Sequence, residues 1–403
     1  MKRLLNIEYA TIHGTYWMYY GVICSFASVF LLSKNYTNSD IGLILAVGNI
    51  VAVILQPIIA DFADRSKRIS ILGITELLAL LLIILTGVMF FFDNKSLALS
   101  GIFIMLVGWL TVIQPLINTL NFKLEQSGIH INFGVGRSIG SLAYSLLCAV
   151  LGSIVQRWGA TTIPITGEIV LILFLISLII TNHHFKKCSN ETNLKLQDDN
   201  LILNEITLTD FVRNNKAFIV VTVGVVGLFF SNAILNNFMM QIVVNVGGNS
   251  EDMGRILSIM AALEIPTMVF FDQIKKKFKC STLIKVSSVA FVIKILLCYI
   301  ANTVKMVLLA QFMQLFSFAL FLPAMVHFID DVMEEGESVK GQAMFTLMIT
   351  VGTVFASLMG GLILDLWGAK SLLLASTIIT AIGAAIILCA VNKVNDKGGS
   401  ING

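Results

Sequence analysis

Three polar residues recur at helical spacing at the start of one apolar segment. Arg137, Ser141 and Tyr144 occupy positions i, i+4 and i+7, so a helix through them presents all three on one face. A guanidinium suits an anion, and an aromatic ring suits stacking. An arginine inside a bilayer costs roughly 2.5–3.5 kcal/mol, so it usually faces a polar cavity. Because Arg137 lies close to the segment's end, an arginine that snorkels to the headgroups is the alternative interpretation.

Carboxamides occur in three other apolar segments, again at helical spacing. An amide can bind a substrate hydroxyl because it both donates and accepts hydrogen bonds, but it does not titrate. These residues are therefore candidate substrate contacts and not proton carriers. The pairs are Gln114 with Asn118, Asn232 with Asn236, and Gln311 with Gln314.

Two charged residues lie deep inside apolar segments, Glu264 and Lys294. An unpaired charge at such a depth is costly, so a residue of this kind marks either a function or a partner. The functional interpretation makes Glu264 the proton-coupling or substrate-contacting acid and Lys294 its modulator. The alternative is a structural ion pair or hydrogen bond that holds two helices together.

Composition identifies the class of protein that must position these residues. Hydrophobic residues make up 57% and charged residues 13% of the 403, against about 45–50% and about 25% in soluble domains. Apolar runs of about 20 residues, each able to cross a bilayer as a helix, recur along the chain. The six cysteines are scattered, and no metal-binding, nucleotide-binding or hydrolase motif occurs. We expect a multi-pass membrane protein that is not an enzyme, with no cofactor, metal or nucleic-acid partner.

The apolar runs predict an all-α protein with twelve transmembrane helices. A polar stretch divides them into two sets of six. The domains predicted are an N-terminal six-helix bundle over 1–181, a cytoplasmic linker over 182–216, a C-terminal six-helix bundle over 217–391 and a cytoplasmic tail over 392–403. The helices are expected at 12–32, 41–60, 69–92, 97–120, 136–155, 163–181, 217–244, 253–271, 281–300, 304–329, 342–364 and 371–391.

Loop charges predict the orientation of these helices. The loops on the side of the N-terminus carry about three times as many Lys and Arg residues as those on the other side, which places both termini in the cytoplasm. Two six-helix halves joined by a cytoplasmic linker are the layout of major facilitator transporters, which bind their substrate between the halves.

The loop after the second expected helix supports this comparison. The stretch 56–68, QPIIADFADRSKR, resembles the superfamily pattern G-x-x-x-D-R-x-G-R-K, with Asp64, Arg65 and Arg68 at matching positions. Ala60 and Lys67 replace its two glycines. Such an acid–base group can pair across helices in one conformation and release in the other, which makes it a candidate conformational gate. The alternative is a plain positively charged cytoplasmic loop.

The stretch 133–144, FGVGRSIGSLAY, resembles the start of helix 5 in the lactose permease branch, which includes the oligosaccharide and phenylpropionate proton symporters. The resemblance implies that Arg137 is the substrate-binding arginine, Ser141 stands for a cysteine, and Tyr144 stands for a tryptophan that stacks on the sugar. It also relates Glu264 and Lys294 to a carboxylate of helix 8 and an arginine of helix 9.

Several departures from that branch weaken its proton relay. Amides replace an acid near Asn118 and acids near Asn232. On the tenth helix, Gln311, Gln314 and Ser317 stand where the branch has a lysine, a histidine and a proton-carrying glutamate. Glu264 is left as the main titratable group.

The sequence therefore predicts a monomeric secondary transporter in the plasma membrane of a bacterium. It would move a small polar organic solute, such as a sugar, nucleoside or aromatic acid, by alternating access with proton symport. An efflux antiporter or an uncoupled facilitator is the alternative, and a membrane sensor without flux is less favoured.

Overall fold

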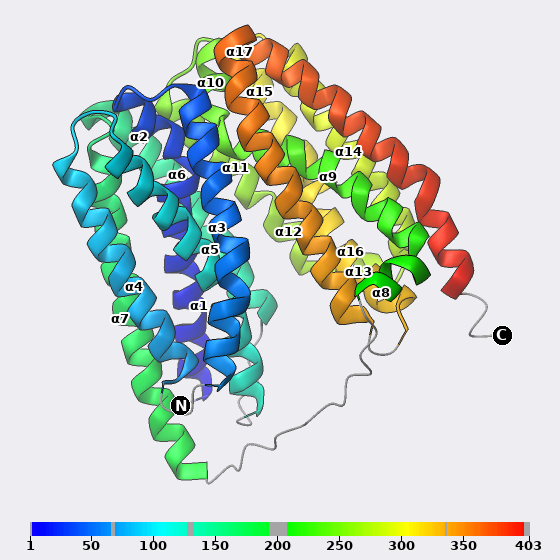
Figure 1. Ribbon diagram of the computed structural model, residues 1–403, viewed down its shortest axis with the longest axis horizontal. Helices are drawn as coiled ribbons and strands as arrows, with labels where there is room; N and C mark the ends of the chain where they lie inside the picture. Colours follow the sequence, from blue (N-terminus) through cyan, green and yellow to red (C-terminus); the bar gives the residue numbers. More distant parts are fainter. Residues whose placement is uncertain (1, 66–68, 127–132, 193–207, 335–336, 399–403) are drawn as a thin grey trace. The chain divides into compact units, whose positions relative to one another are not determined.

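The computed structural model describes residues 2–65, 69–126, 133–192, 208–334 and 337–398. Every regular element in these ranges is a helix (Figure 1). Nine of the helices described there are long and apolar enough to cross a membrane, or ten if the bent pair Leu4–Ser25 and Ala27–Ser33 forms one span. Long helices suit a bilayer because they satisfy their backbone polar groups internally. The expected number of twelve stays a prediction.

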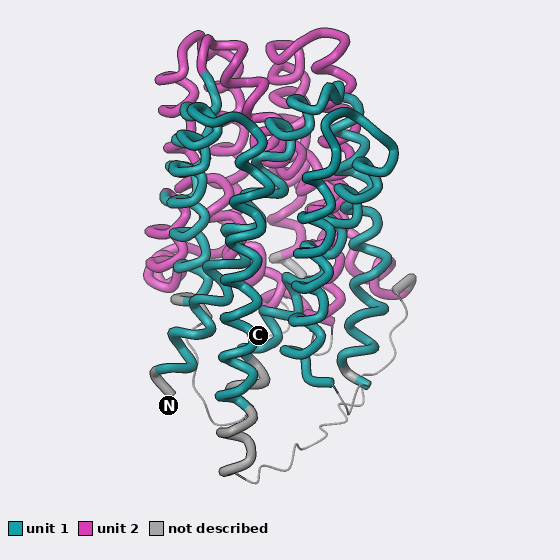
Figure 2. The backbone as a smooth tube through the Cα atoms, turned by 90° about the vertical axis from the view of Figure 1, so that its left-hand side faces the viewer, with its two compact units in different colours: residues 1–198, 249–262 teal, residues 199–248, 263–403 magenta. Residues whose placement is uncertain are grey.

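Packing divides the chain into two compact units (Figure 2). Unit 1 contains residues 1–198 and 249–262, and unit 2 contains residues 199–248 and 263–403. The segment 249–262 packs with unit 1 although it follows the first part of unit 2 in the sequence. The domain boundaries expected from the sequence stay a prediction.

Unit 1 is a helical bundle whose first helix is interrupted. A π-helix, η1 (Gly21–Ser25), separates α1 (Lys2–Tyr20) from α2 (Ala27–Ser33), and Phe26 between them has φ −96° and ψ 8°. The first expected helix therefore begins earlier and is bent. The other elements are α3 (Asn38–Arg65), α4 (Ile71–Val88), η2 (Met89–Phe91), α5 (Leu97–Gln126), α6 (Phe133–Trp158), α7 (Thr162–Thr192) and α11 (Ser250–Ala262).

Small residues hold α11 against α6. A Cβ atom placed on Gly152 would lie 2.7 Å from the carbonyl oxygen of Ser250 and 2.9 Å from the Cα atom of Gly254. The two backbones can approach this closely only because both positions are glycine. Serines add polar contacts, since the Ser145 hydroxyl donates to the Ser258 carbonyl at 2.8 Å.

Unit 2 contains more broken helices than the sequence predicts. The expected helix 217–244 is interrupted at Phe238. The expected helix 253–271 is interrupted at Leu263, where the chain passes from α11 of unit 1 into unit 2. Pro266 explains the second break, because proline has no N–H to donate to the carbonyl of Ala262 four residues earlier. The elements are α8 (Leu208–Asn214), α9 (Lys216–Asn237), α10 (Met239–Asn245), α12 (Glu264–Val269), α13 (Phe271–Lys275), α14 (Cys280–Ile300), α15 (Val304–Ala310), η3 (Gln311–Leu315), α16 (Phe318–Val332) and α17 (Ser338–Gly398), which turns at Gly368 with φ 76°.

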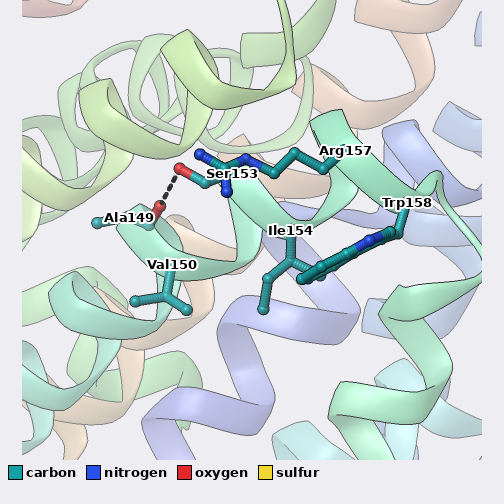
Figure 3. Close-up of a pocket in the computed structure, with 6 residues that line it drawn as sticks. All are labelled: Ala149, Val150, Ser153, Ile154, Arg157 and Trp158. Atoms are coloured by element: carbon teal, nitrogen blue, oxygen red, sulfur yellow. Dashed lines mark hydrogen bonds between the residues drawn. The ribbon is translucent and has the colours of Figure 1, made fainter.

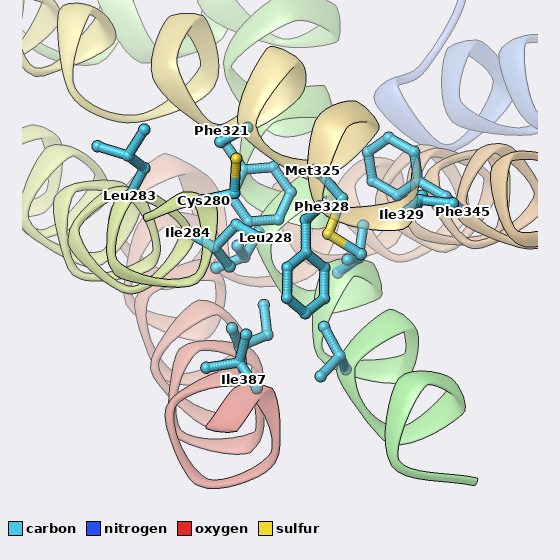
Figure 4. Close-up of a cluster of buried hydrophobic side chains, with 14 of the residues drawn as sticks. Leu228, Cys280, Leu283, Ile284, Phe321, Met325, Phe328, Ile329, Phe345 and Ile387 are labelled. Atoms are coloured by element: carbon cyan, nitrogen blue, oxygen red, sulfur yellow. The ribbon is translucent and has the colours of Figure 1, made fainter. Parts of the chain in front are cut away.

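Buried aliphatic and aromatic side chains form a core around α14 and α16 in unit 2 (Figure 4). The rings of Phe229, Phe291 and Phe321 meet with centroid distances of 5.9–6.2 Å. Edge-to-face contacts of this kind add to the free energy of burial. Because Phe291 is one helical turn before Lys294, the core also fixes the depth of that lysine.

Candidate functional site

The polar face expected on α6, which consists of Arg137, Ser141 and Tyr144, lies against the first helical segments within unit 1. A guanidinium N–H of Arg137 donates to the Ser141 hydroxyl at 3.0 Å, one helical turn away. The guanidinium carbon of Arg137 lies 4.2 Å from the centroid of the Trp17 ring, within the range of a cation–π interaction. His13 and Tyr9 lie on α1 nearby, with their ring centroids 4.7 Å apart. Arg137 is therefore held by both helices, and it remains half-buried.

Tyr144, the third residue of this polar face, is buried and forms a hydrogen bond to η1. Its hydroxyl lies 2.6 Å from the Ser25 hydroxyl. The π-helical turn Gly21–Ser25 supplies this serine, and single π-helical turns are frequent at functional sites. Gly21 also leaves room for the ring, since a Cβ there would lie 3.3 Å from the ring carbons of Tyr144.

The amide pair on α5 keeps access to the surface of unit 1. Gln114 and Asn118 are both half-buried, one turn apart on either side of Pro115. Asn121, further along, is buried. Gln114 and Asn118 therefore have side-chain surface for a solute, whereas Asn121 has little.

In unit 2 a glutamine joins the two deep charges. The Gln314 side-chain N–H₂ donates to a carboxylate oxygen of Glu264 at 2.8 Å, and the Lys294 ammonium donates to the Gln314 carbonyl oxygen in a short hydrogen bond. All three side chains are buried, with Lys294 and Gln314 only 1% exposed. The amide thus connects a carboxylate on α12 to an ammonium on α14, with each end in its favoured orientation.

The 3-10 turn η3 places the polar residues of the tenth expected helix on one side. A 3-10 helix has three residues per turn, so Gln311 and Gln314 lie on one side of it. Gln311 is fully buried and donates to the Val307 carbonyl at 2.9 Å. Ser317 is also fully buried, at the break before α16. Neither of the two glutamines has exposed surface for a solute in this conformation.

The amides near the end of α9 are more accessible. Asn232 and Asn236 are half-buried, and the Asn236 side chain donates to the Asn232 carbonyl at 2.8 Å. Asn237 donates to the Ser357 hydroxyl on α17 at 3.0 Å. Asn232 and Asn236 keep surface available in unit 2.

The expected gate is only partly described. Arg68 and the side chain of Asp64 lie outside the described part of the chain. Arg65 is exposed at the end of α3 and bonds Asp61 of the same helix at 2.7 Å. Within the described ranges no three His, Cys, Asp or Glu residues come together in a way that could hold a metal ion.

Comparison with known proteins decides the family. The profile of the MFS_1 like family matches residues 9–375. The chain belongs to this family. A Bacillus subtilis (strain 168) protein described as the uncharacterized transporter YwbF is 20% identical over 404 residues, which cover 97% of this chain and 95% of that protein.

Solved structures share the fold of this family member. The crystal structure of the nucleoside transporter NupG matches with a TM-score of 0.73 and 14% identity over 98% of each chain. A bacterial homologue of the human lysosomal transporter Spinster, in an inward-facing and unoccupied conformation, matches with a TM-score of 0.70 and 14% identity over 98% of each chain. The family match, the apolar helices of the described residues and this shared fold together identify the chain as a multi-pass membrane transporter of the major facilitator type.

Two residues of this transporter's unit 1 site escape the sequence motifs, Trp17 and Ser25. The role of Trp17 could have been predicted from the sequence, because Trp17 lies four residues after His13 on the same helix face and an arginine commonly stacks on tryptophan. The role of Ser25 could not have been predicted in this way, since the position of Ser25 depends on the π-helical turn. The bridging role of Gln314 was also not predicted.

Proposed function

We propose that this protein is a secondary active transporter that moves a small polar organic solute by alternating access, with proton symport through Glu264. Sugars, nucleosides and aromatic acids are the solutes proposed. The protein would act as a monomer in a bacterial plasma membrane, with twelve helices and both termini in the cytoplasm.

The hydrogen-bonded chain Glu264–Gln314–Lys294 is the observation that carries this proposal. Gln314 can donate to Glu264 while the carboxyl is ionised. Protonation removes the negative charge that this bond and the nearby ammonium of Lys294 both favour. Proton binding therefore weakens the connection between α12 and α14, and a proton can bias the packing of unit 2.

We use the solvent exposure of each candidate side chain to decide whether we assign it to solute binding or to proton coupling. The half-buried residues Arg137, Gln114 and Asn118 of unit 1, and Asn232 and Asn236 of unit 2, are the proposed solute contacts. Ser141 and Tyr144 would position the solute side of α6 through their bonds to Arg137 and Ser25. Gln311 and Gln314 are buried, so we assign them to the interior beside the coupling acid.

A gate formed by Asp64, Arg65 and Arg68 completes the proposal. The exposed pair of Arg65 and Asp61 supports it, because an exposed ion pair is weak enough to exchange partners during a conformational change.

An uncoupled facilitator is the second candidate, and Lys294 favours it. A charged Lys294, linked to Glu264 through Gln314, would supply the counter-charge that a transported proton otherwise supplies. If Lys294 keeps Glu264 ionised throughout the cycle, solute would equilibrate without accumulating.

Uptake from a pool of metabolites into proteoliposomes tests both candidates. We expect the wild type to accumulate a solute only with an inward proton gradient, and Glu264→Gln to equilibrate that solute without concentrating it. Glu168→Gln is the matched control, since Glu168 is a half-buried carboxyl on α7 of the other unit. Gradient-independent equilibration by the wild type would establish the facilitator. Accumulation by Glu264→Gln would remove Glu264 from the coupling role.

A further inference from the structure

A shallow pocket of about 310 Å³ lies at the C-terminal end of α6, away from the residues discussed above (Figure 3). Its lining residues all belong to this helix. They are Ala149, Val150, Ser153, Ile154, Arg157 and Trp158. The pocket is therefore a surface that one helix presents to its surroundings.

Apolar side chains form a stripe that winds part of the way around α6, because four residues turn an α-helix by about 400°. Leu142, Leu146, Val150, Ile154 and Trp158 repeat every four residues, which spans roughly 24 Å of helix. Leu146 and Val150 are 60% and 57% exposed. A stripe of this length and exposure matches an acyl chain that winds along the helix surface with it.

A polar edge runs beside the last part of the stripe. Ser153 and Arg157 are one turn apart, and the Arg157 side chain extends back along the helix toward Ser153 (Figure 3). The Ser153 hydroxyl donates to the Ala149 carbonyl at 3.3 Å, a long bond that a stronger acceptor can replace. The guanidinium and the hydroxyl therefore offer donors at the same level of the helix.

The end of α6 fixes these groups at one height. Gly159 adopts φ 85°, a left-handed conformation that ends the helix directly after Trp158. Trp158 is 67% exposed, and tryptophan concentrates at the level of lipid headgroups. The neighbouring face is already occupied, since Gln156 accepts a hydrogen bond from Ser250 of α11 at 2.9 Å.

The charge of the pocket is positive. Arg157 is exposed and forms no ion pair with the acids that the structure describes, whereas Arg255 of the same unit is paired with Glu251. A guanidinium beside a hydroxyl suits the oxygens of a phosphate, which it can bind through two parallel N–H groups. A headgroup that carries its own ammonium would bring a like charge close to Arg157.

We propose that this pocket binds an anionic phospholipid. Arg157 and Ser153 hold the phosphate, Trp158 packs beside the glycerol region, and one acyl chain follows the stripe from Ile154 to Leu142. Free phosphate would leave the apolar stripe uncovered, which is why we assign the site to a lipid. The proposal does not depend on which solute the protein transports.

Titration of the delipidated protein in detergent with short-chain phosphatidylglycerol, followed by native mass spectrometry, tests this site. We expect Arg157→Gln to weaken phosphatidylglycerol binding about tenfold, as the loss of a charge-assisted hydrogen bond would. The matched control Arg255→Gln should bind like the wild type, because the guanidinium of Arg255 already has a partner. Phosphatidylcholine with the same chains should bind the wild type about tenfold more weakly.

Four outcomes would overturn the proposal. Arg157→Gln could bind phosphatidylglycerol as tightly as the wild type, or phosphatidylcholine could equal phosphatidylglycerol. Inorganic phosphate could bind as tightly as the lipid, which would indicate an anion site only. A dimer that forms without lipid and is lost on Leu146→Ser substitution would assign the stripe to a second copy of the chain.

Discussion

The guanidinium of Arg137 stacks on the indole of Trp17, with 4.2 Å between the guanidinium carbon and the ring centroid. This contact joins α6 to α1 inside unit 1, and the Ser141 hydroxyl fixes one N–H of the same guanidinium. The arginine is therefore fixed in orientation before any solute binds. Such a fixed group loses little conformational entropy when it binds a ligand.

Removal of the indole should impair transport without unfolding the protein. We expect Trp17→Leu to lower uptake about fivefold, because a cation–π contact contributes about 1 kcal/mol. Trp17→Phe, which keeps a ring, should lose less. Trp367→Leu is the control, since Trp367 is 66% exposed in unit 2. Uptake by Trp17→Leu equal to the wild type would show that Arg137 does not need the indole.

The two deep charges should behave as one unit in unfolding experiments. Glu264→Gln and Lys294→Met should each lower the free energy of unfolding by about 3 kcal/mol, because each leaves a buried charge without its counterpart. The double variant should lose about 1–3 kcal/mol less than the sum. Unfolding in mixed micelles measures the loss in the free energy of unfolding for the two single variants and the double variant.

The exposed pair of Glu251 and Arg255 supplies the matched double-mutant cycle. Its coupling energy should be about 0.5 kcal/mol or less, as for other exposed i, i+4 pairs. Equal coupling energies in the two cycles would contradict the assignment of Glu264, Gln314 and Lys294 to one buried chain.

A bulky side chain at Asn118 should block transport while the fold survives. Asn118 is half-buried on α5, so part of the Asn118→Trp side chain can project from the helix. We expect uptake to fall below detection and the melting temperature to stay close to that of the wild type. Leu77→Trp, at a 64% exposed position on α4, should transport normally. Normal uptake by Asn118→Trp would place Asn118 outside the solute path.

The contact between α6 and α11 should not tolerate a side chain. Gly152→Leu forces the two backbones apart, because even its Cβ would lie 2.7 Å from the Ser250 carbonyl oxygen. Overpacking of this kind costs about 1–3 kcal/mol. Gly101→Leu on α5 is the control, since a Cβ there meets nothing within 4 Å. Thermal unfolding that is unchanged by Gly152→Leu would show that α11 can leave α6 freely.

Much of the helical pattern could be predicted from the sequence, because long apolar runs have few other structures available in a bilayer. The shared helix face of Arg137 and Ser141 follows from their spacing, whereas the hydrogen bond between them is seen only in the structure. Contacts between distant segments could not be predicted in the same way. Trp17 meets Arg137 only because α1 and α6 pack side by side, and Gln314 reaches Glu264 across 50 positions of the sequence.

Breaks in helices were the other difficulty. The interruption at Leu263 could be anticipated from Pro266, which removes a backbone donor within the expected helix 253–271. The π-helical turn before Phe26 had no comparable signal, because the sequence GVICS has no residue that requires it. As a result the partner of Tyr144 could not be identified from the motif that contains Tyr144.

The membership of α11 in unit 1 has a consequence during synthesis. The helices α1 to α7 leave the ribosome first, but the face of α6 that carries Gly152 stays uncovered until residue 262 has been made. The packing of unit 1 is therefore completed only by α11, a segment that is synthesised after α9 and α10. Because residues 199–248 of unit 2 precede α11 in the sequence, unit 1 cannot be completed before part of unit 2 has been synthesised.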